Sequence, residues 1–186
     1  MAKKALKGFS GLQIFPVTKN DGTGTGYTVG TAVSIPGAQS FERTPQVSEW
    51  KIYADDGIYD SGSDWQGDKV TITLAELPVT LKQYFEGGTY DSTSQVYTYK
   101  STSQAPELGL SFKCLQSDGT WKMVKIYSFK ASSFKDSYKT KGEGNDITSV
   151  TIEGTVMNRV IDNVVKDEKE AATTDDFTWL NTLVAA

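Results

Sequence analysis

The chain contains no histidine and only one cysteine among its 186 residues. Without histidine, the Ser-His-Asp and Cys-His catalytic arrangements, histidine-ligated zinc and histidine proton shuttles are all excluded. A lone Cys114 cannot form an intramolecular disulfide or a Cys-x-x-Cys site, and its neighbours Phe112 and Leu115 place it in a strand-like sequence. We therefore expect Cys114 to be a half-buried structural residue rather than a nucleophile.

Long apolar runs and a basic excess are also missing. No stretch approaches the roughly 20 apolar residues of a membrane-spanning helix, and residues 1–12 hold lysines without the apolar run of a signal peptide. Nineteen basic and 23 acidic side chains give a net charge of −4, unlike proteins that grip nucleic acid. We expect synthesis in a reducing, cytosol-like compartment, without membrane insertion or tight nucleic-acid binding.

What the chain does contain is a β-rich pattern within a length that fits one domain. Short runs rich in Thr, Val, Tyr, Phe and Trp alternate with clusters of Gly, Asp, Asn and Ser, which predicts a mainly β fold. The predicted strands are Phe9–Val17, Tyr27–Ile35, Val47–Ala54, Lys69–Ala75, Val96–Lys100, Leu108–Gln116, Trp121–Lys130 and Asp146–Met157. Ser117-Asp118-Gly119 is a turn signal that predicts a hairpin between two of them.

Several of these strands set apolar residues against small polar ones, as antiparallel strands with one core face and one hydrated face do. The polar positions singled out are Thr71, Thr73, Ser149, Thr151, Glu153 and Thr155. In Val47–Ala54 the same alternation predicts that Trp50 and Ile52 face the core. An ordinary solvated sheet surface and a smooth, hydrated functional wall both fit the polar positions.

One helix is predicted between the strands. Pro78 suits the first helical position, because its missing N–H costs nothing there. Leu81, Tyr84 and Phe85 then fall on one helical face, and a Gly-Gly pair follows as a stop. Because the helix is short, we expect its stability to come from packing this face on a sheet.

Two polar segments are predicted to be exposed loops, Ala54–Gly67 and Lys139–Asn145. The residues singled out in the first are Asp55, Asp56, Ile58, Tyr59, Asp60, Asp64 and Trp65. With Asp60 as the first ligand of an EF-hand, the sixth position is Trp65 instead of Gly and the twelfth is Thr71 instead of Glu. A solvated acidic loop is favoured, and a calcium site of another type stays open.

The end of the sequence has the composition of an arm. Lys166–Asp176 is a charged tract, and Phe177, Trp179 and Leu180 begin an apolar cluster behind it. A polar spacer followed by an apolar cluster is typical of a segment that docks on a neighbouring copy or on its own domain. The chain is therefore divided into a β-domain over residues 1–160 and a C-terminal arm over residues 161–186.

Three stretches, in this order and spacing, resemble the major tail protein, or tail tube protein, of siphophages. The stretches are Glu49–Gly57 with the acidic segment as far as Trp65, then Val70–Gly88, then Val124–Phe129 followed by Lys139–Glu143 and Val150–Thr155. Together they cover residues 9–158 of the chain, and the arm at its end has no counterpart in the resemblance.

The resemblance implies a structural virion protein of a bacteriophage, not an enzyme, with no cofactor and no metal. It implies an antiparallel β-sandwich or half-barrel with one flanking α-helix and an extended loop, to which the composition of this chain adds the C-terminal arm. Such subunits self-assemble into hexameric rings, which stack into a tail tube used for DNA ejection. The acidic loop would reach between rings, and the polar strand positions would face a lumen that is typically net negative in this family.

The implied partners are further copies of the chain, a tape measure protein, tail tip or terminator proteins, and viral DNA in transit without specific binding. The implied location is the virion tail, after synthesis in the cytoplasm of a bacterial host. Two other classes compete with this interpretation. A carbohydrate-binding β-sandwich would use exposed aromatic residues such as Trp65. A hydrolase would use two carboxylates across a cleft, but no pair in the sequence stands out for that role.

Overall fold

The computed structural model describes residues 4–24, 26–138, 149–171 and 174–183. The predicted loop Lys139–Asn145 therefore lies outside the described residues. The elements are β1 (Leu6–Asn20), β2 (Tyr27–Val29), β3 (Val33–Ser34), β4 (Ala38–Ala54), β5 (Gly57–Leu74), α1 (Val79–Glu86), β6 (Thr89–Asp91), β7 (Val96–Thr98), β8 (Glu107–Gln116), β9 (Trp121–Lys135), β10 (Val150–Met157), β11 (Lys166–Ala171) and a 3-10 helix, η1 (Thr174–Asn181).

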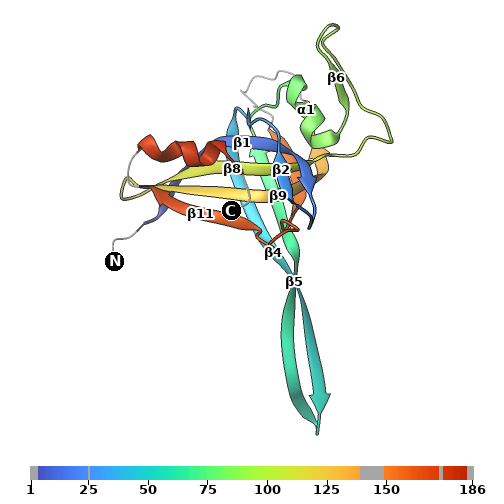
Figure 1. Cartoon of the computed structure of the whole chain (residues 1–186), viewed down its shortest axis with the longest axis vertical. Coiled ribbons are helices and arrows are strands. Elements are labelled where there is room, and N and C mark those ends of the chain that lie inside the picture. The colour runs from blue at the N-terminus through green and yellow to red at the C-terminus, as the bar shows by residue number, and fades with distance from the viewer. Residues whose placement is uncertain (1–3, 25, 139–148, 172–173, 184–186) are drawn as a thin grey trace.

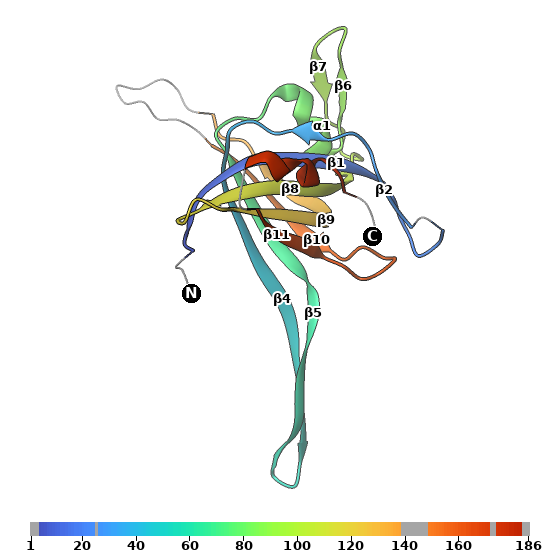
Figure 2. The ribbon, with the colours of Figure 1, turned by 60° about the vertical axis from the view of Figure 1, so that its left-hand side comes forward.

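A nine-stranded antiparallel sheet dominates the molecule. Its order is β2-β1-β8-β9-β10-β5-β4, with β3 beside β1 and β11 beside β9, and β6 and β7 form a separate hairpin. Figures 1 and 2 show β1, β8 and β9 running across the body while β4 and β5 run steeply downward, so the sheet is strongly twisted. The predicted mainly β, antiparallel fold with a flanking α-helix is confirmed.

The sheet curls round a single main core. The ring centroids of Phe9 on β1 and Phe41 on β4 are 6.3 Å apart, although these strands lie near opposite ends of the sheet. The most deeply buried residues of this core, at most 1% exposed, are Leu12, Ile14, Val70, Ile72, Leu74, Leu108, Leu110, Ile126, Phe129, Ile152 and Val156. These alternate positions all point to the concave side, which is the geometry of a half-barrel filled by side chains.

α1 closes one part of this core. Phe85 is 2% exposed, and Leu81 and Tyr84 pack beside it as partly buried residues, which confirms the predicted apolar face. The helix ends at Gly87, whose φ of 73° is left-handed and whose N–H donates to the Gln83 carbonyl at 3.1 Å. A Cβ at Gly87 would lie 1.8 Å from the Gln104 carbonyl oxygen, so only glycine fits at this helix end.

The acidic segment differs from its prediction, because it is not a loop. β4 and β5 pair from Ala38 and Leu74 as far as Ala54 and Gly57, which leaves only Asp55 and Asp56 as the turn. Both turn residues have positive φ, 50° and 60°, as a two-residue hairpin turn requires and as aspartate tolerates. Ser, Gly and Asp have low strand propensity, but here the cross-strand ladder determines the conformation.

β11 is the second difference from the sequence-based expectation, because Lys166–Ala171 was predicted to belong to a charged spacer. It pairs with β9 from Lys166 opposite Ile126 to Ala171 opposite Trp121. Its side chains add charged contacts across the ladder, because Glu168 lies 2.7 Å from Lys122 of β9. The hydroxyl of Tyr127, also on β9, donates to Asp167 at 2.5 Å. A strand of charged residues is thus held in place by pairing with a central strand.

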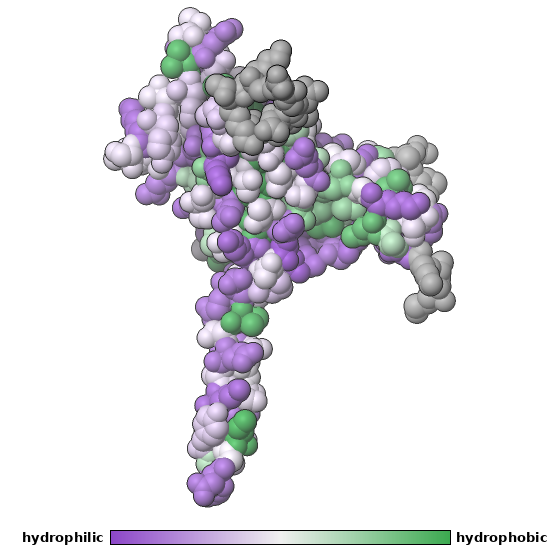
Figure 3. Space-filling model, turned by 180° about the vertical axis from the view of Figure 1, so that it is seen from behind, coloured by the Kyte–Doolittle hydropathy of each residue, from purple (hydrophilic) through white to green (hydrophobic). Residues whose placement is uncertain are grey.

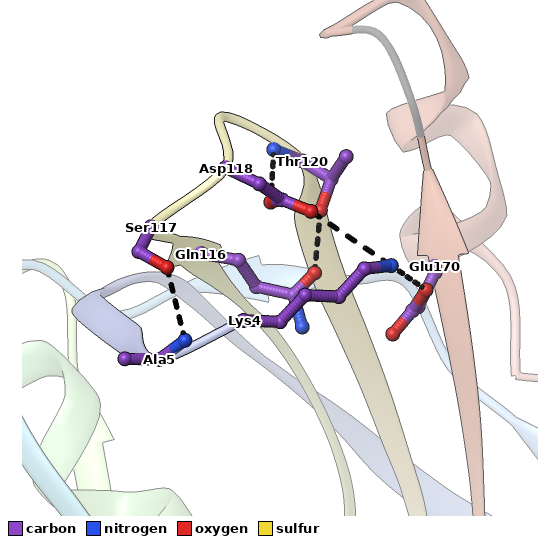
Figure 4. Close-up of polar contacts among 7 residues, drawn as sticks. All are labelled: Lys4, Ala5, Gln116, Ser117, Asp118, Thr120 and Glu170. Carbon is purple, nitrogen blue, oxygen red and sulfur yellow. Dashed lines mark hydrogen bonds and ion pairs between the residues drawn. The ribbon is translucent and has the colours of Figure 1, made fainter. Parts of the chain in front are cut away.

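The predicted hairpin at Ser117-Asp118-Gly119 is present between β8 and β9. Its turn is tied to the start of the chain and, through Lys4, to β11, as Figure 4 shows. Asp118 accepts hydrogen bonds from Thr120, the Ser117 hydroxyl accepts the Ala5 N–H at 3.0 Å, and Lys4 lies 2.5 Å from Glu170 of β11. The start of the chain, this turn and β11 therefore form one edge of the body.

Candidate assembly surfaces

One face of β4, β5, β10 and the second half of β9 is uniformly polar, and we call it the polar face. Cross-strand pairing aligns it in three rows, Ser40-Thr73-Thr151-Lys135, Glu42-Thr71-Glu153-Ser133 and Thr44-Lys69-Thr155-Lys130. All these side chains are exposed or half-buried, whereas the intervening Val70, Ile72 and Ile152 are fully buried. A β-bulge in β9 at Ser132 separates the second row from the third.

The polar face brings together five of the six strand positions singled out in the sequence, because Thr71, Thr73, Thr151, Glu153 and Thr155 share it. Ser149, the sixth, is exposed and lies directly before β10. The structure therefore gathers these side chains on the convex side of the sheet, away from the core. Their role as the wall of a lumen stays a prediction.

The charges of the polar face nearly cancel. Lys69 and Glu153, in neighbouring rows, form an ion pair of 3.2 Å that is open to solvent and contributes little stability. Glu42, Lys130 and Lys135 complete the charged positions, so the face carries two acids and three lysines. This composition differs from the net negative wall that the resemblance implies.

Beyond the body, residues 46–66 of β4 and β5 form a long two-stranded ribbon, which we call the projecting hairpin (Figures 1 and 2). Its large apolar side chains are between 40% and 76% exposed, and they are Val47, Trp50, Ile52, Tyr53, Ile58, Tyr59 and Trp65. Figure 3 shows hydrophobic patches spaced along the hairpin between hydrophilic ones. An isolated ribbon is marginally stable in water and has no core of its own, so such a surface marks an interaction site.

Trp50 and Ile52 correct the sequence analysis, which assigned them to the core. They are 41% and 50% exposed, because this half of β4 has left the body and has no sheet or helix packed on it. Trp50 instead lies across the backbone of Gly62, its partner on β5, since a Cβ there would fall 2.5 Å from Cζ2 of the indole. Alternation alone does not distinguish a buried face from one that awaits a partner.

The projecting hairpin also carries a concentrated negative charge. Residues 46–66 hold five acidic side chains and one lysine, a net charge of −4 that equals the net charge of the whole chain. Asp55 and Asp56 form its tip, and Asp60 and Asp64 lie on β5. Apolar and acidic side chains are thus interleaved along one protruding element.

A buried acid anchors the base of the hairpin. Asp68 is fully buried and accepts hydrogen bonds from the Trp65 indole N–H, at 2.8 Å, and from the guanidinium of Arg43. A β-bulge at this level sets Gln66 and Gly67 opposite one residue of β4, and Gly67 adopts a φ of 109°. Bulges bend and twist a strand, so this network defines the angle at which the hairpin leaves the body.

Sequence reasoning missed Asp68 and Arg43. The sequence does indicate Asp68 through the alternation of the strand. Asp68 lies two residues before Val70, so both side chains are on the core face of the same strand. An acid in phase with buried apolar residues must have partners, since an unpaired buried charge is costly. Arg43 gives no comparable signal, because its contact with Asp68 depends on the pairing of β4 with β5.

The apolar cluster of the C-terminal arm lies on the body of the same chain. Leu180 is 4% exposed, and Phe177 and Trp179 are half-buried beside it. The ammonium groups of Lys113 and Lys125 lie 3.5 Å and 4.0 Å from the ring centroids of Phe177 and Trp179, respectively. Burial lowers the pKa of Lys125 from its ordinary value.

Two contacts fix η1 and the residues after it against β8. The Ser111 hydroxyl donates to the Leu180 carbonyl at 2.9 Å. Leu183 is 1% exposed and occupies the space over Gly109, where a Cβ would lie 2.7 Å from its Cδ1. The outer side of β8 and β9 is therefore covered by the arm, whereas the outer side of β10, β5 and β4 is the open polar face.

Comparisons with known proteins find a likeness among solved structures. No family model and no curated protein matches the chain. Among solved structures it is similar to a chain in the cryo-EM structure of the six-fold symmetrised anti-feeding prophage baseplate, with 10% identity, a TM-score of 0.41, and 94% of this chain and 99% of that chain covered. Because the TM-score is below 0.5, the function proposed below is argued from this chain's own surfaces.

Two further observations concern what the described residues contain. No helix among them is long and apolar enough to cross a membrane. In the same part of the chain, no three His, Cys, Asp or Glu side chains come together as a metal site would need.

Proposed function

We propose that this chain is a structural protein of a phage tail, which self-assembles into hexameric rings that stack into the tube through which DNA passes into the host. The observation that carries the proposal is the projecting hairpin. Seven large apolar side chains of this hairpin are exposed to solvent in the single subunit. A surface of this kind needs a partner, and identical subunits supply it in a self-assembling particle.

The direction of the hairpin favours stacking. α1 and the β6–β7 hairpin lie at the end of the body opposite to the projecting hairpin, as Figure 2 shows. Copies arranged head to tail would therefore bring the hairpin of one subunit against the body of the next. A head-to-tail arrangement is open-ended along its axis, as a growing tube requires.

The polar face suits the wall of a conduit. Its rows consist largely of threonine and serine, and its charges nearly cancel. The three lysines of each subunit exceed its two acids by only one, so the attraction to the phosphate backbone would be weak and the wall would let DNA pass. No cofactor and no catalytic step enters this role, and the partners are other tail proteins such as the tape measure, tail tip and terminator proteins.

The test is electron microscopy of the purified protein in negative stain, combined with size-exclusion chromatography, at rising protein concentration. Rings or tubes about as wide as a phage tail are expected without any added ligand. A chain that stays monomeric at all concentrations and binds glycans would overturn the proposal. That outcome would favour a carbohydrate-binding module that uses the aromatic residues of the hairpin.

A further inference from the structure

The projecting hairpin has little support from the rest of the molecule. Beyond the pair Val47–Trp65, the outer parts of β4 and β5 form a ladder only with each other among the described residues. Four of the eight residues 57–64 of β5 are glycine or aspartate, which have low strand propensity. An isolated two-stranded ribbon is marginally stable in water, so local contacts must hold this one together in a free subunit.

One such contact joins the two strands near the middle of the hairpin. Trp50 and Gly62 lie directly opposite each other in the ladder. A Cβ on Gly62 would lie 2.5 Å from Cζ2 and 2.7 Å from Cε2 of the indole, so the ring packs on the bare glycine backbone. Trp50 is accordingly less exposed than Tyr53 and Tyr59, at 41% against 69% and 76%.

Gly62 is required at this position for its missing side chain and not for its backbone conformation. It is not among the described glycines with positive φ, so its backbone would accept other residues. Glycine by itself weakens a strand, because it has no side chain to pack. An aromatic side chain that covers a cross-strand glycine compensates for this weakness.

The contact lies between two fixed points at the ends of the hairpin. At the base, the Trp65 indole donates to the buried Asp68. At the tip, the turn Asp55–Asp56 has the positive φ angles that a two-residue turn requires. The pairs on either side of Trp50 and Gly62 set a charged residue opposite a serine, and they are Glu49–Ser63 and Lys51–Ser61. The packing of Trp50 therefore joins the strands where their other pairs are polar.

The state of the hairpin before assembly affects how readily copies stack. A hairpin that is already ordered has less conformational entropy to lose when it binds the next copy. A segment that folds only on binding loses that entropy at the moment of association, which weakens each contact. Ile52, Tyr53 and Ile58 remain exposed for a partner surface while Trp50 orders the ribbon.

We propose that Trp50, packed on the backbone of Gly62, holds the projecting hairpin in its paired form in the free subunit, so that the stacking element is built before assembly begins. The inference rests on the proposed function, because stacking is the step that a preformed hairpin favours. Trp50 is then a positioning residue for the rest of the hairpin, and Gly62 is the residue that admits it. Tubes would grow without a further protein that first orders the hairpin.

The variant Gly62→Thr tests this role, because it fills the space of the indole and keeps all seven apolar side chains of the hairpin. Ser63→Thr is the matched control, since it adds a strand-favouring residue at the next position, opposite Glu49. Amide hydrogen exchange of residues 47–65 is measured in the dilute monomer, and the threshold concentration of tube formation is measured by microscopy. In Gly62→Thr the hairpin amides should exchange roughly fivefold faster or more, and the threshold should rise by a similar factor. Ser63→Thr should change neither quantity.

A second variant separates the loss of the contact from a general effect of threonine. Trp50→Thr combined with Gly62→Thr removes the indole and sets two threonines opposite each other, which is a favourable cross-strand pair. Its hairpin amides should exchange within about threefold of wild type, because threonine at position 62 is harmful only beside Trp50. Thermal unfolding of every variant should give an unchanged midpoint, since the hairpin contributes no core residue.

The outcomes separate this inference from the proposed function. Wild-type hairpin amides that exchange as fast as those of an unstructured peptide would overturn the role of Trp50. So would a Gly62→Thr hairpin as protected as wild type, a double variant as unprotected as Gly62→Thr alone, or an unchanged threshold despite faster exchange. A wild-type monomer with a protected hairpin that forms no tube at any concentration would instead overturn the proposed function, and the ordering by Trp50 would stand.

Discussion

At the scale of residues, Asp68 links the core to the projecting hairpin. It is the one fully buried acid among the described residues, and it joins Trp65 of the hairpin to Arg43 of the body strand β4. The hydrogen bonds to this carboxylate hold both partners at the bulge. The orientation of the hairpin therefore depends on a single side chain that is itself remote from the exposed tip.

Replacing Asp68 by alanine is expected to destabilise the fold by about 2–3 kcal/mol, because two hydrogen bonds to a buried charged group are lost. Urea unfolding of the purified subunit measures this change. Asp64→Ala, at an exposed position on the same strand, is the control and should change the stability by less than about 0.5 kcal/mol. Equal effects of the two substitutions would contradict the anchoring role.

Tyr127 predicts a dependence of stability on alkaline pH. Burial and the hydrogen bond to Asp167 raise the pKa of its hydroxyl to about 12. The raised pKa in the folded state means that this contribution is complete below pH 10 and is lost as the pH rises toward 12. By pH 11 the loss is on the order of 1 kcal/mol.

Urea midpoints between pH 9 and pH 11 test this loss in the wild type and in Tyr127→Phe. The variant lacks the titrating hydroxyl, so its stability should fall less steeply over this range even though it starts lower. Parallel curves for the two proteins would show that Tyr127 is not the group responsible.

At the scale of elements, regular alternation predicted some strands well and missed others. Lys69–Leu74 and Val150–Met157 were found because one side of each packs in the core and the other is solvated. Val47–Ala54, the outer part of β4, was also predicted as a strand from its alternation, although its apolar side is exposed. The outer part of β5 and all of β11 were missed, because their residues are exposed on both faces or charged. Their conformation comes from pairing with a partner strand, which local propensity does not encode.

The residues of the polar face also divide into those that the sequence predicts and those that it does not. The polar positions of β5 and β10 could be chosen from the sequence, since polar and apolar residues alternate there. Ser40, Glu42 and Lys135 could not, because their place on the polar face depends on which strands are neighbours. Neighbour relations between strands distant in sequence are a property of the folded sheet.

The projecting hairpin is expected to be dispensable for folding and necessary for stacking. In the test variant Asn-Gly replaces residues 48–64, so that the pair Val47–Trp65 and the contact of Trp65 with Asp68 are kept. The subunit should unfold at a temperature close to wild type, because the removed part contributes no core residue. In chromatography and microscopy it should form no tube where wild type does.

A full-length control changes only the turn, with Asp55→Asn and Asp56→Gly, and should assemble normally. An unfolded short variant would mean that the hairpin contributes to the core. Tubes formed by the short variant would mean that stacking depends on another segment.

At the scale of the whole molecule, opposite sides of one sheet serve different purposes. The concave side is filled by the core, and the convex side is divided between the C-terminal arm over β8 and β9 and the polar face over β10, β5 and β4. The arm covers the half that carries Met123 together with Lys113 and Lys125. The uncovered half is the one proposed to meet DNA.

Adding lysines to the polar face should therefore slow DNA transit without preventing assembly. Thr151→Lys with Thr155→Lys places two further positive charges on the polar face, one at a half-buried and one at an exposed position, and each subunit of a ring would repeat them. Assembled particles should show tubes of normal appearance and a lower rate of DNA release, because basic side chains attract the phosphate backbone. Thr178→Lys, on exposed η1, is the control. An unchanged release rate would place the polar face outside the conduit.

The even number of strands behind the polar face has a consequence for the bore of such a tube. The four strands β4, β5, β10 and β9 alternate in direction, so copies joined edge to edge in a ring would keep this alternation whatever their number, and strand pairing by itself would permit rings of many diameters. The diameter must then come from the curvature of the sheet, and barrel width grows with strand number. The bulge at Ser132 bends β9 within residues 131–135, the stretch that pairs only with β10, so one extra residue there would tilt each copy of a ring relative to its neighbour. The diameter of the channel would then depend on the β-bulge of a single strand.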